Sequence, residues 1–531
     1  MNKFCFLILL IGVVSFFNMS LFAKVDMPEK ERALKIANLF SDSVVLQYNE
    51  PIRVWGWGAI GAEVRIRFDE HDYVTIVDSK GCWDLVLKSC ISLNPQELIV
   101  RSGEDRILIK DVLMGEVWLA SGQSNMAYPV SKSDVNDHLP EMSYDKIRFF
   151  KSIEIMSEFP EDEIFGIWQK SNKKNRQKFS AVAFSYAVAL HKKLGRPIGI
   201  IQSARGGSRC EAWVPKDQLD LDHKFYSYPM KFVRNFETRN SELIENYYRT
   251  VSDWKSSGRI WPTPKYSEKQ LGGYIIRKPY GLYNGMIHPL YRFRIKGALW
   301  YQGEGNSGES EAYSHLFPKM IGLWRKNWGY DFPFYFVQLP AFIRNDLKVQ
   351  KDANFNKKDH YQENLNIRHK WASFREAQAK TLRIKDTGMV VTLDTGEPFD
   401  VHPSEKFVIG HRLAQSSMHS TYGLDVVGRG PYFLGKLSFD AGNIRVPLGS
   451  SEGLKTQDGL PPKGFSIAGE DQVFYWVDKI VIDKNALIMS SSKVPRPIAV
   501  RYAWLEFPEV NLFNGANLPM EPFRTDNWEI R

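Results

Sequence analysis

The chain has 531 residues, which is too long for a single hydrophobic core and favours two to four domains. With 43% hydrophobic and 25% charged residues it has an ordinary globular composition, which excludes a largely disordered chain. The net charge of +9 comes from 70 basic and 61 acidic residues, with much of the excess in residues 170–178 and 344–370. Neither stretch is a basic stripe interleaved with aromatic residues, so we expect no nucleic-acid partner.

The amino-terminal residues predict export from the cytoplasm. A basic start, Met1-Asn-Lys3, is followed by the apolar run Phe4–Phe17 and then by the small residue Ala23. This pattern predicts a cleaved signal peptide over residues 1–23 and a secreted or periplasmic protein, and the alternative is an uncleaved membrane anchor. No later segment has the apolar length of a membrane span, so no stable membrane insertion is expected after cleavage.

Three cysteines follow the predicted signal peptide, namely Cys82, Cys90 and Cys210. An odd number argues against a full disulfide framework. Cys82 and Cys90 are either paired across a hairpin or buried as thiols, and both readings stay open. Neither a zinc-type Cys/His spacing nor an acidic calcium loop is present, so we expect no metal and no other cofactor.

Residues 24–111 are rich in β-branched and aromatic residues. Short alternating runs recur about every ten residues, as in Ile52–Gly58, Val64–Phe68 and Trp83–Leu87. This spacing predicts an amino-terminal β-sandwich domain.

Residues 112–422 change to apolar strands that alternate with helical stretches. The helical stretches are 182–194, 313–328 and 371–382. Alternation of this kind predicts an α/β domain with a parallel sheet covered by helices on both faces. Two polar inserts, 215–279 and 344–370, interrupt it, and residues 423–531 are again β-rich.

The first chemical motif lies where an early strand of this domain ends. The apolar run Val117–Ala120 stops in the small polar turn Ser121-Gly-Gln-Ser124-Asn125. Such a turn presents a hydroxyl at the carboxyl edge of a parallel strand, where ligands bind in open sheets. Ser124 is therefore a candidate nucleophile, and an ordinary strand-ending turn is the alternative.

Two later strands also end in turns that contain glycine. Residues 198–203 lead to Gly206-Gly207, and residues 298–301 lead to the string Gln302-Gly-Glu-Gly-Asn. Backbone N–H groups at such turns can stabilise a developing oxyanion, and glycine permits the close approach that this requires. Each block alone is equally compatible with a plain turn.

A fourth block supplies a base. A serine hydroxyl is a weak nucleophile at neutral pH, and the histidine side chain has a suitable pKa to take its proton. His402 lies in a loop flanked by proline, with Asp400 two residues and Asp394 eight residues before it. A carboxylate commonly holds such a histidine in the required tautomer. Asp400, Asp394 and a backbone carbonyl remain the alternatives for that role.

The four blocks, in this order, resemble those of the sialate O-acetylesterase family of SGNH-type carbohydrate esterases. The Gly-Gln-Ser-Asn-Met string at 122–126 matches almost letter for letter, and Asp-x-His-Pro at 400–403 matches the closing block. The match extends from residues 38–47 to 522–526 and is loose in the two inserts. The resemblance implies an SGNH-hydrolase three-layer α/β/α fold flanked by two β-rich regions.

The resemblance also implies roles for individual residues. Ser124, His402 and Asp400 would be catalytic, with Asp394 as a secondary candidate. Gly207 and Gln302 would line the oxyanion hole, and Gly206 and Asn306 are secondary candidates there. Glu304 is a further secondary candidate for the site. Many superfamily relatives have Asp-x-x-His, whereas position 399 here is Phe.

The expected activity is removal of acetyl groups from O-acetylated sugars, with sialic acids as the leading substrates. An acetylxylan or other polysaccharide acetylesterase is the enzymatic alternative, because none of the four blocks reads the sugar. A carbohydrate-binding protein without catalysis is the alternative from another class. The string Gly449-Ser-Ser451-Glu-Gly imitates a hydrolase elbow, but no helix can follow it, so we expect a surface loop. The sequence leaves the sugar, the acetyl position and the oligomeric state undecided.

Overall fold

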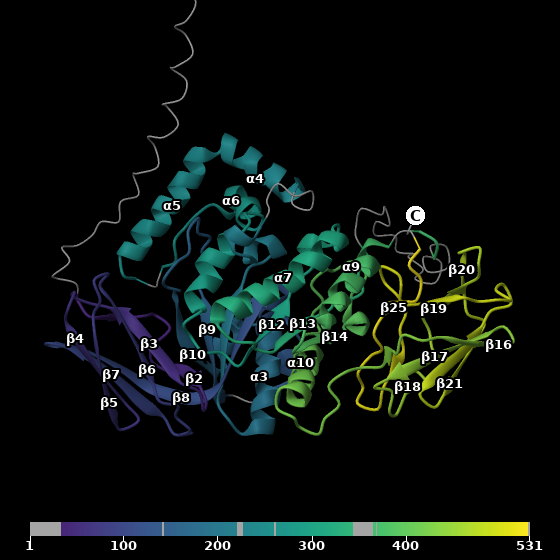
Figure 1. The fold of residues 1–531 in the computed structure, drawn as a ribbon, viewed down its shortest axis with the longest axis horizontal. Helices are drawn as coiled ribbons and strands as arrows, with labels where there is room; N and C mark the ends of the chain where they lie inside the picture. Colours follow the sequence, from purple (N-terminus) through teal and green to yellow (C-terminus); the bar gives the residue numbers. More distant parts are fainter. Residues whose placement is uncertain are drawn as a thin grey trace, which may run out of the picture. The chain divides into compact units, whose positions relative to one another are not determined.

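The computed structural model describes residues 33–140, 143–219, 227–259, 262–343, 365–367 and 369–528 (Figure 1). The predicted signal peptide and most of the charged insert 344–370 lie outside these residues. The chain forms two compact units. The first comprises residues 1–37, 53–87 and 98–108, and the second comprises residues 38–52, 88–97 and 109–531.

The first unit is built from short antiparallel strands. Its strands, two of which extend into the second unit, are β1 (Lys35–Ile36), β3 (Ile52–Trp57), β4 (Glu63–Phe68), β5 (His71–Ile76), β6 (Cys82–Leu87) and β7 (Gln96–Ser102). Strands β1, β3 and β6 form one sheet, and β4 pairs with β5 and β7. Exposed and buried residues alternate strictly along β4, as expected for a strand with one face on the core. Trp83 is buried beneath Gly56, where a Cβ atom would lie 2.5 Å from the indole ring.

The second unit is organised around a mostly parallel sheet with the order β10-β9-β11-β8-β12-β13-β14. Its strands are β8 (Asp105–Gly122, in this unit from residue 109), β9 (Ser143–Ser152), β10 (Gly166–Asn172), β11 (Ile198–Ala204), β12 (Gly297–Tyr301), β13 (Phe334–Val337) and β14 (Thr387–Val390). Only β10 runs antiparallel to its neighbour in this order. Strand β2 (Val45–Gln47) pairs with the earlier part of β8. The parallel sheet expected from the alternating pattern is therefore confirmed.

Side chains on β13 show that helices cover both faces of this sheet. Tyr335 contacts Trp118, which in turn contacts Tyr186 of α3 (Ala181–Leu194). Phe334 and Phe336 point to the other face and contact Phe317 of α7 (Ser310–Trp328). Because neighbouring residues of a strand point to opposite faces, α3 and α7 lie on opposite sides, which gives the three-layer architecture.

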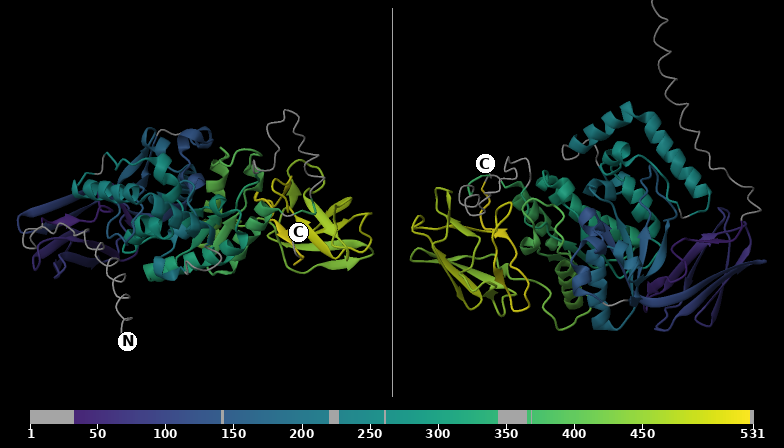
Figure 2. Two further views of the ribbon diagram at one scale, coloured as in Figure 1. Left: turned by 90° about the horizontal axis from the view of Figure 1, so that it is seen from above. Right: turned by 180° about the vertical axis from the view of Figure 1, so that it is seen from behind.

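Each of these helices has a partner in its own layer. Helix α10 (Phe407–Ser420) packs beside α3, and the views agree on this (Figure 2). Gly410 permits the close approach, because a Cβ atom there would lie 2.4 Å from the carbonyl oxygen of Val182. Helix α9 (Lys370–Ala379) packs on α7 through Phe374 and Tyr313. Helices α4 (Ser227–Arg239), α5 (Ser241–Ser256) and α6 (Glu268–Ile275) belong to the polar insert 215–279.

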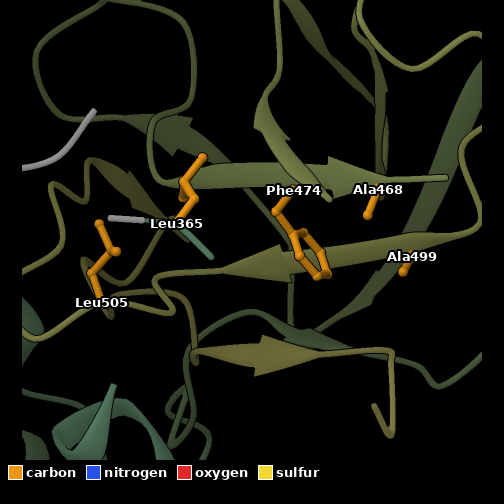
Figure 3. Close-up of a cluster of buried hydrophobic side chains, with 5 residues drawn as sticks. All are labelled: Leu365, Ala468, Phe474, Ala499 and Leu505. Atoms are coloured by element: carbon orange, nitrogen blue, oxygen red, sulfur yellow. The ribbon is translucent and has the colours of Figure 1, made fainter. Parts of the chain in front are cut away.

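Residues from about 430 onward form antiparallel sheets within the second unit. The strands are β15 (Tyr432–Phe433), β16 (Ser438–Asp440), β17 (Asn443–Gly449), β18 (Lys455–Thr456), β19 (Phe465–Ala468), β20 (Phe474–Trp476), β21 (Lys479–Asp483), β22 (Ala486–Ser490), β23 (Ala499–Tyr502), β24 (Leu512–Phe513) and β25 (Phe523–Arg524). One buried cluster is shown in Figure 3 and consists of Leu365, Ala468, Phe474, Ala499 and Leu505. The β-rich region expected after residue 422 is confirmed.

The carboxyl-terminal strands are tied to α9 by Arg375. This guanidinium is fully buried and donates to the carbonyl oxygens of Ala503, Leu505 and Glu506. Burial lowers the pKa of Arg375 to about 10. These contacts fit the grouping of the carboxyl-terminal strands with the α/β sheet in one unit.

Two further points concern the described residues as a whole. Cys82, Cys90 and Cys210 form no disulfide among the described residues. Within the described ranges, no helix combines the length and the apolar character needed to cross a bilayer.

Candidate active site

Ser124 lies at the carboxyl end of β8, the strand between β11 and β12 in the sheet. The strand ends at Gly122, whose φ of +130° is accessible mainly to glycine. A Cβ atom there would lie 2.2 Å from the carbonyl oxygen of Tyr301, so only glycine fits this turn. Ser124 then begins the short helix α1 (Ser124–Ala127). The turn therefore places the Ser124 side chain at the edge where β8 stops.

His402 meets Ser124 although 278 residues separate them in the chain. The distance between His402 Nε2 and Ser124 Oγ is 2.7 Å, which is a hydrogen bond. The ring of Tyr128 stacks beside the imidazole at 6.3 Å between centroids. Burial lowers the pKa of His402, against an opposing effect of the Asp400 carboxylate. The imidazole is thereby kept neutral near pH 7, the state that can accept a proton.

Asp400 and Asp394 occupy different positions around this histidine. Asp400 Oδ1 accepts a hydrogen bond of 2.8 Å from the backbone N–H of His402. Within the described residues, no hydrogen bond joins the Asp400 carboxylate to the imidazole ring. Asp394 lies in the short 3-10 helix Leu393–Thr395 and makes a bidentate pair with Arg412, at 2.8 and 2.6 Å. Asp400 is thus bonded within the loop that carries His402, whereas Asp394 is paired with an arginine of α10.

Gly206 and Gly207 form a turn directly after β11. Gly207 has φ +71°, and a Cβ atom on Gly206 would lie 3.7 Å from the Cβ of Ser124. The glycine pair and the serine therefore lie side by side. Across the described part of the chain, the backbone N–H groups of Ser124 and Gly207 have no protein acceptor. The same holds for the N–H group of Gly206, so backbone donors from both turns are available at this edge.

Gln302 and Asn306 are brought to the same edge but are bonded to their neighbours. The Gln302 amide donates to the carbonyl oxygen of Ser208 at 3.1 Å and to Asn306 Oδ1 at 2.9 Å. Asn306 Nδ2 donates to Glu211 at 3.0 Å, and Asn306 Oδ1 also accepts from the N–H of Cys210. Both hydrogens of the Gln302 amide are therefore used within the protein, where they fix the turn that follows Gly207.

Sequence reasoning gave no role to Asn125 or Lys406, which the structure places beside the Ser124–His402 pair. Asn125 and Lys406 are fully buried, and Lys406 Nζ donates to Asn125 Oδ1 at 2.9 Å. Glu304, a secondary candidate, accepts from the Asn125 amide. The signal in the sequence was the Asn that follows the serine and the Lys four residues after His402, but a lysine in a polar loop is normally solvated.

Some hydrolases use a metal ion, which requires a cluster of ligand side chains. Throughout the described residues, no group of three or more His, Cys, Asp or Glu side chains is arranged to hold one.

Comparisons with known proteins identify the family. No family model matches the chain. The chain is 27% identical to the sialate O-acetylesterase of Mus musculus, over 89% of this chain and 90% of that protein. It is 26% identical to the human sialate O-acetylesterase, over 73% of this chain and 71% of that one.

A solved structure extends this similarity to the fold. The crystal structure of a carbohydrate acetylesterase from Xanthomonas citri matches with a TM-score of 0.76 and 32% identity. The match covers 93% of this chain and all of that one. It confirms the SGNH-like α/β fold class and the resemblance inferred from the four blocks. The chain therefore belongs to the sialate O-acetylesterase family of carbohydrate acetylesterases, and it is an ester hydrolase.

Proposed function

We propose that this protein is a secreted or periplasmic enzyme that removes acetyl groups from O-acetylated sugars through an acyl-enzyme on Ser124. The observation that carries the proposal is the 2.7 Å hydrogen bond between Ser124 Oγ and His402 Nε2. It pairs a hydroxyl with a neutral imidazole at the carboxyl edge of the sheet, as nucleophilic catalysis requires.

In the first half of the reaction, Ser124 Oγ attacks the acetyl carbonyl carbon while its proton passes to His402 Nε2. The C–O bond to the sugar then breaks, and the imidazolium gives its proton to the departing sugar oxygen. In the second half, a water molecule attacks the acetyl-serine as His402 takes a proton from that water. Acetate leaves and Ser124 recovers its hydrogen from the imidazolium.

The oxyanion of each tetrahedral intermediate is stabilised by the N–H groups of Ser124 and Gly207. Their freedom from protein acceptors supports this assignment, since such donors must be available when charge develops. Gln302 contributes by fixing the Ser208 carbonyl, and thereby the turn that carries the Gly207 N–H. Gly206 lies beside Ser124, because a Cβ atom there would be 3.7 Å from the Cβ atom of Ser124.

Asp400 acts on His402 through charge and through the loop backbone. Its carboxylate opposes the lowering of the His402 pKa by burial, so it favours the imidazolium that forms in the transition state. Its hydrogen bond to the His402 N–H fixes the loop. Asp394 is instead the counter-ion of Arg412.

The substrate is proposed from the relatives and the location from the sequence. The curated mammalian relatives are named for O-acetylated sialic acids, which makes these sugars the first substrates to test. The pattern of residues 1–23 supports export. An acetylated plant polysaccharide is the second candidate, because the described active-site groups act on the acetyl ester.

Release of p-nitrophenol from p-nitrophenyl acetate tests the proposed chemistry, with Ser124→Ala as the nucleophile variant. We expect kcat to fall by about 10³-fold or more in that variant while the protein stays folded. A matched control is Ser451→Ala, because Ser451 donates to the Leu448 carbonyl in a loop after β17. Turnover near the wild-type value in Ser124→Ala, or loss of turnover in Ser451→Ala alone, would refute the assignment.

Acetate release from O-acetylated sialic acid and from acetylated xylan then identifies the sugar. Faster release from sialic acid, as kcat/KM, supports the leading substrate. A higher kcat/KM on acetylated xylan would instead indicate a polysaccharide acetylesterase. No release from either, with an inactive aryl-ester assay, would leave a carbohydrate-binding protein.

A further inference from the structure

The side chain of Asn125, next to the proposed nucleophile, is held from both ends. Its Oδ1 accepts from Lys406 Nζ at 2.9 Å. Its Nδ2 donates to Glu304 and, at 2.9 Å, to the carbonyl oxygen of Val401. Val401 directly precedes His402, so this amide connects the nucleophile turn to the loop that carries the base.

Lys406 determines which end of the amide faces which partner. An ammonium group only donates hydrogen bonds, so it must face the amide oxygen. The NH2 group is then turned toward Glu304 and the Val401 carbonyl, both of which accept. In the flipped orientation two oxygens would meet at Val401 and two donors would meet at Lys406.

Lys406 is enclosed by the protein and bonded at both its side chain and its backbone. Its side chain is fully buried, with its Nζ 5.0 Å from the centroid of the Tyr128 ring. Its own backbone N–H and that of Phe407 donate to Asp134 Oδ1, which fixes the start of α10. In the described part of the chain Lys406 makes no direct ion pair, so Asn125 is the group through which it meets Glu304.

Glu304 completes the cluster from the end of β12. Its Oε1 accepts from Asn125, whereas Oε2 is buried without a hydrogen-bond partner. Burial raises the pKa of this carboxyl group, against the attraction of Lys406 and the bond from Asn125.

We propose that Lys406 is a positioning residue of the esterase: its ammonium group orients the Asn125 amide, which anchors the Val401 carbonyl and so holds His402 over Ser124. This role rests on the proposed function of Ser124 and His402. It complements Asp400, which bonds the backbone N–H of His402 on the other side of the same peptide segment.

The cluster also sets the electrostatic environment of the base. The charged groups that act on the His402 ring are Asp400, which raises its pKa, and Lys406 and Lys132, which lower it. Burial lowers the pKa of Lys406 to about 8, and the carboxylates that oppose this are Glu304, Asp134, Asp400 and Glu397. Replacing either lysine by methionine should therefore raise the pKa of His402 and move the acid limb of kcat/KM to higher pH.

Lys132 is the matched control, because it shares this electrostatic effect and is not bonded to Asn125. In Lys406→Met, kcat on the pH plateau should fall by up to about 10²-fold, as for a catalytic group displaced by about 1 Å. In Lys132→Met the acid limb should move in the same direction while the plateau kcat stays at the wild-type value. An unchanged plateau in Lys406→Met would overturn the proposal.

A double-mutant cycle tests whether Lys406 acts through Asn125. Lys406→Met should change the plateau kcat of an Asn125→Ala protein by less than about twofold, because the group on which it acts is gone. The full loss in both backgrounds would refute the route through Asn125. If Lys406→Met does not fold, the single variant Asn125→Ala takes its place, because it removes the bond to the Val401 carbonyl. A plateau kcat at the wild-type value in Asn125→Ala would then overturn the proposal.

The failure of this proposal is distinguishable from failure of the proposed function. Ser124→Ala on the aryl acetate tests the nucleophile, whatever the outcome of the cycle. If the losses of plateau kcat in Lys406→Met and Asn125→Ala are additive and Ser124→Ala is inactive, only the positioning role of Lys406 is refuted. Wild-type turnover in Ser124→Ala would refute the proposed function itself.

Discussion

Asp394 and Asp400 lie close together in the sequence, and the structure predicts that neutralising them has different effects. Asp394 is the bidentate partner of Arg412, whose side chain is only 4% exposed. In Asp394→Asn the guanidinium keeps its bond to the Val391 carbonyl but loses its counter-charge. Removing one partner of a buried pair costs about 3–5 kcal/mol. Because the Asp394 side chain is 20% exposed, we expect the lower end, about 3 kcal/mol.

In a unit of this size such a loss lowers Tm by about 3 °C. The Asp400→Asn protein should instead unfold at the wild-type temperature, since an amide oxygen can still accept the His402 N–H. Its kcat should fall on the order of tenfold, and its acid limb should move to lower pH, because the charge that raises the pKa of His402 is gone.

Thermal unfolding followed by circular dichroism and kcat on p-nitrophenyl acetate separate the two effects. A double variant, Asp394→Asn with Arg412→Met, serves as the control, because removing both charges should recover part of the stability. The reasoning fails if Asp394→Asn unfolds at the wild-type temperature yet loses more kcat than Asp400→Asn. That result would transfer the orienting role to Asp394.

Three other outcomes are expected. Gly122→Ala should abolish the fold of the site, seen as insoluble protein or a large fall in Tm, because its Cβ would lie 2.2 Å from a strand carbonyl. The control Gly195→Ala, also at positive φ but with open space around it, should lower the free energy of unfolding by roughly 1–2 kcal/mol. Equal effects of the two variants would contradict the steric argument. The acid limb of wild-type kcat/KM should have its midpoint below 6.5, because burial lowers the pKa of His402 and the neutral imidazole is the active base; a midpoint above 7 would contradict this. Gln302→Ala should lower kcat on an aryl acetate by roughly 10²-fold with little change in KM, because the turn at Ser208 loses its anchor; an unchanged kcat would exclude Gln302 from any role in the oxyanion hole.

The parallel sheet and the turns that carry the four blocks followed from local sequence patterns, whereas the order of the strands did not. The predicted helical stretch 313–328 corresponds to α7, which begins three residues earlier and contains Pro318. The turn at Ser124 and the glycine pair after β11 were predictable because short apolar runs ended in small residues. Local patterns of this kind are sufficient wherever one strand and one turn determine the position of a residue.

Contacts that depend on distant parts of the chain were not predictable. The direction of the Gln302 amide depends on Ser208, 94 residues away, and on Asn306. The burial of Lys406 depends on the packing of aromatic rings from other segments, whereas Ser404 and Glu405, which precede it in the sequence, are polar. Asp400 was one of three candidates to orient the His402 ring, and only the loop conformation directs its carboxylate to the backbone N–H of His402.

The position of β14 at the edge of the sheet makes the two halves of the site unequal in local stability. Ser124 follows a central strand, whereas His402 follows β14, for which β13 is the one strand partner in the described part of the chain. Edge elements open more readily than central ones, because fewer backbone bonds must break. Local unfolding at this edge would separate His402 from Ser124, while Ser124 would keep its position after the central strand. Heat or denaturant should therefore abolish turnover before most of the sheet unfolds. Slow hydrogen exchange of the β8 amides should persist in the inactive protein.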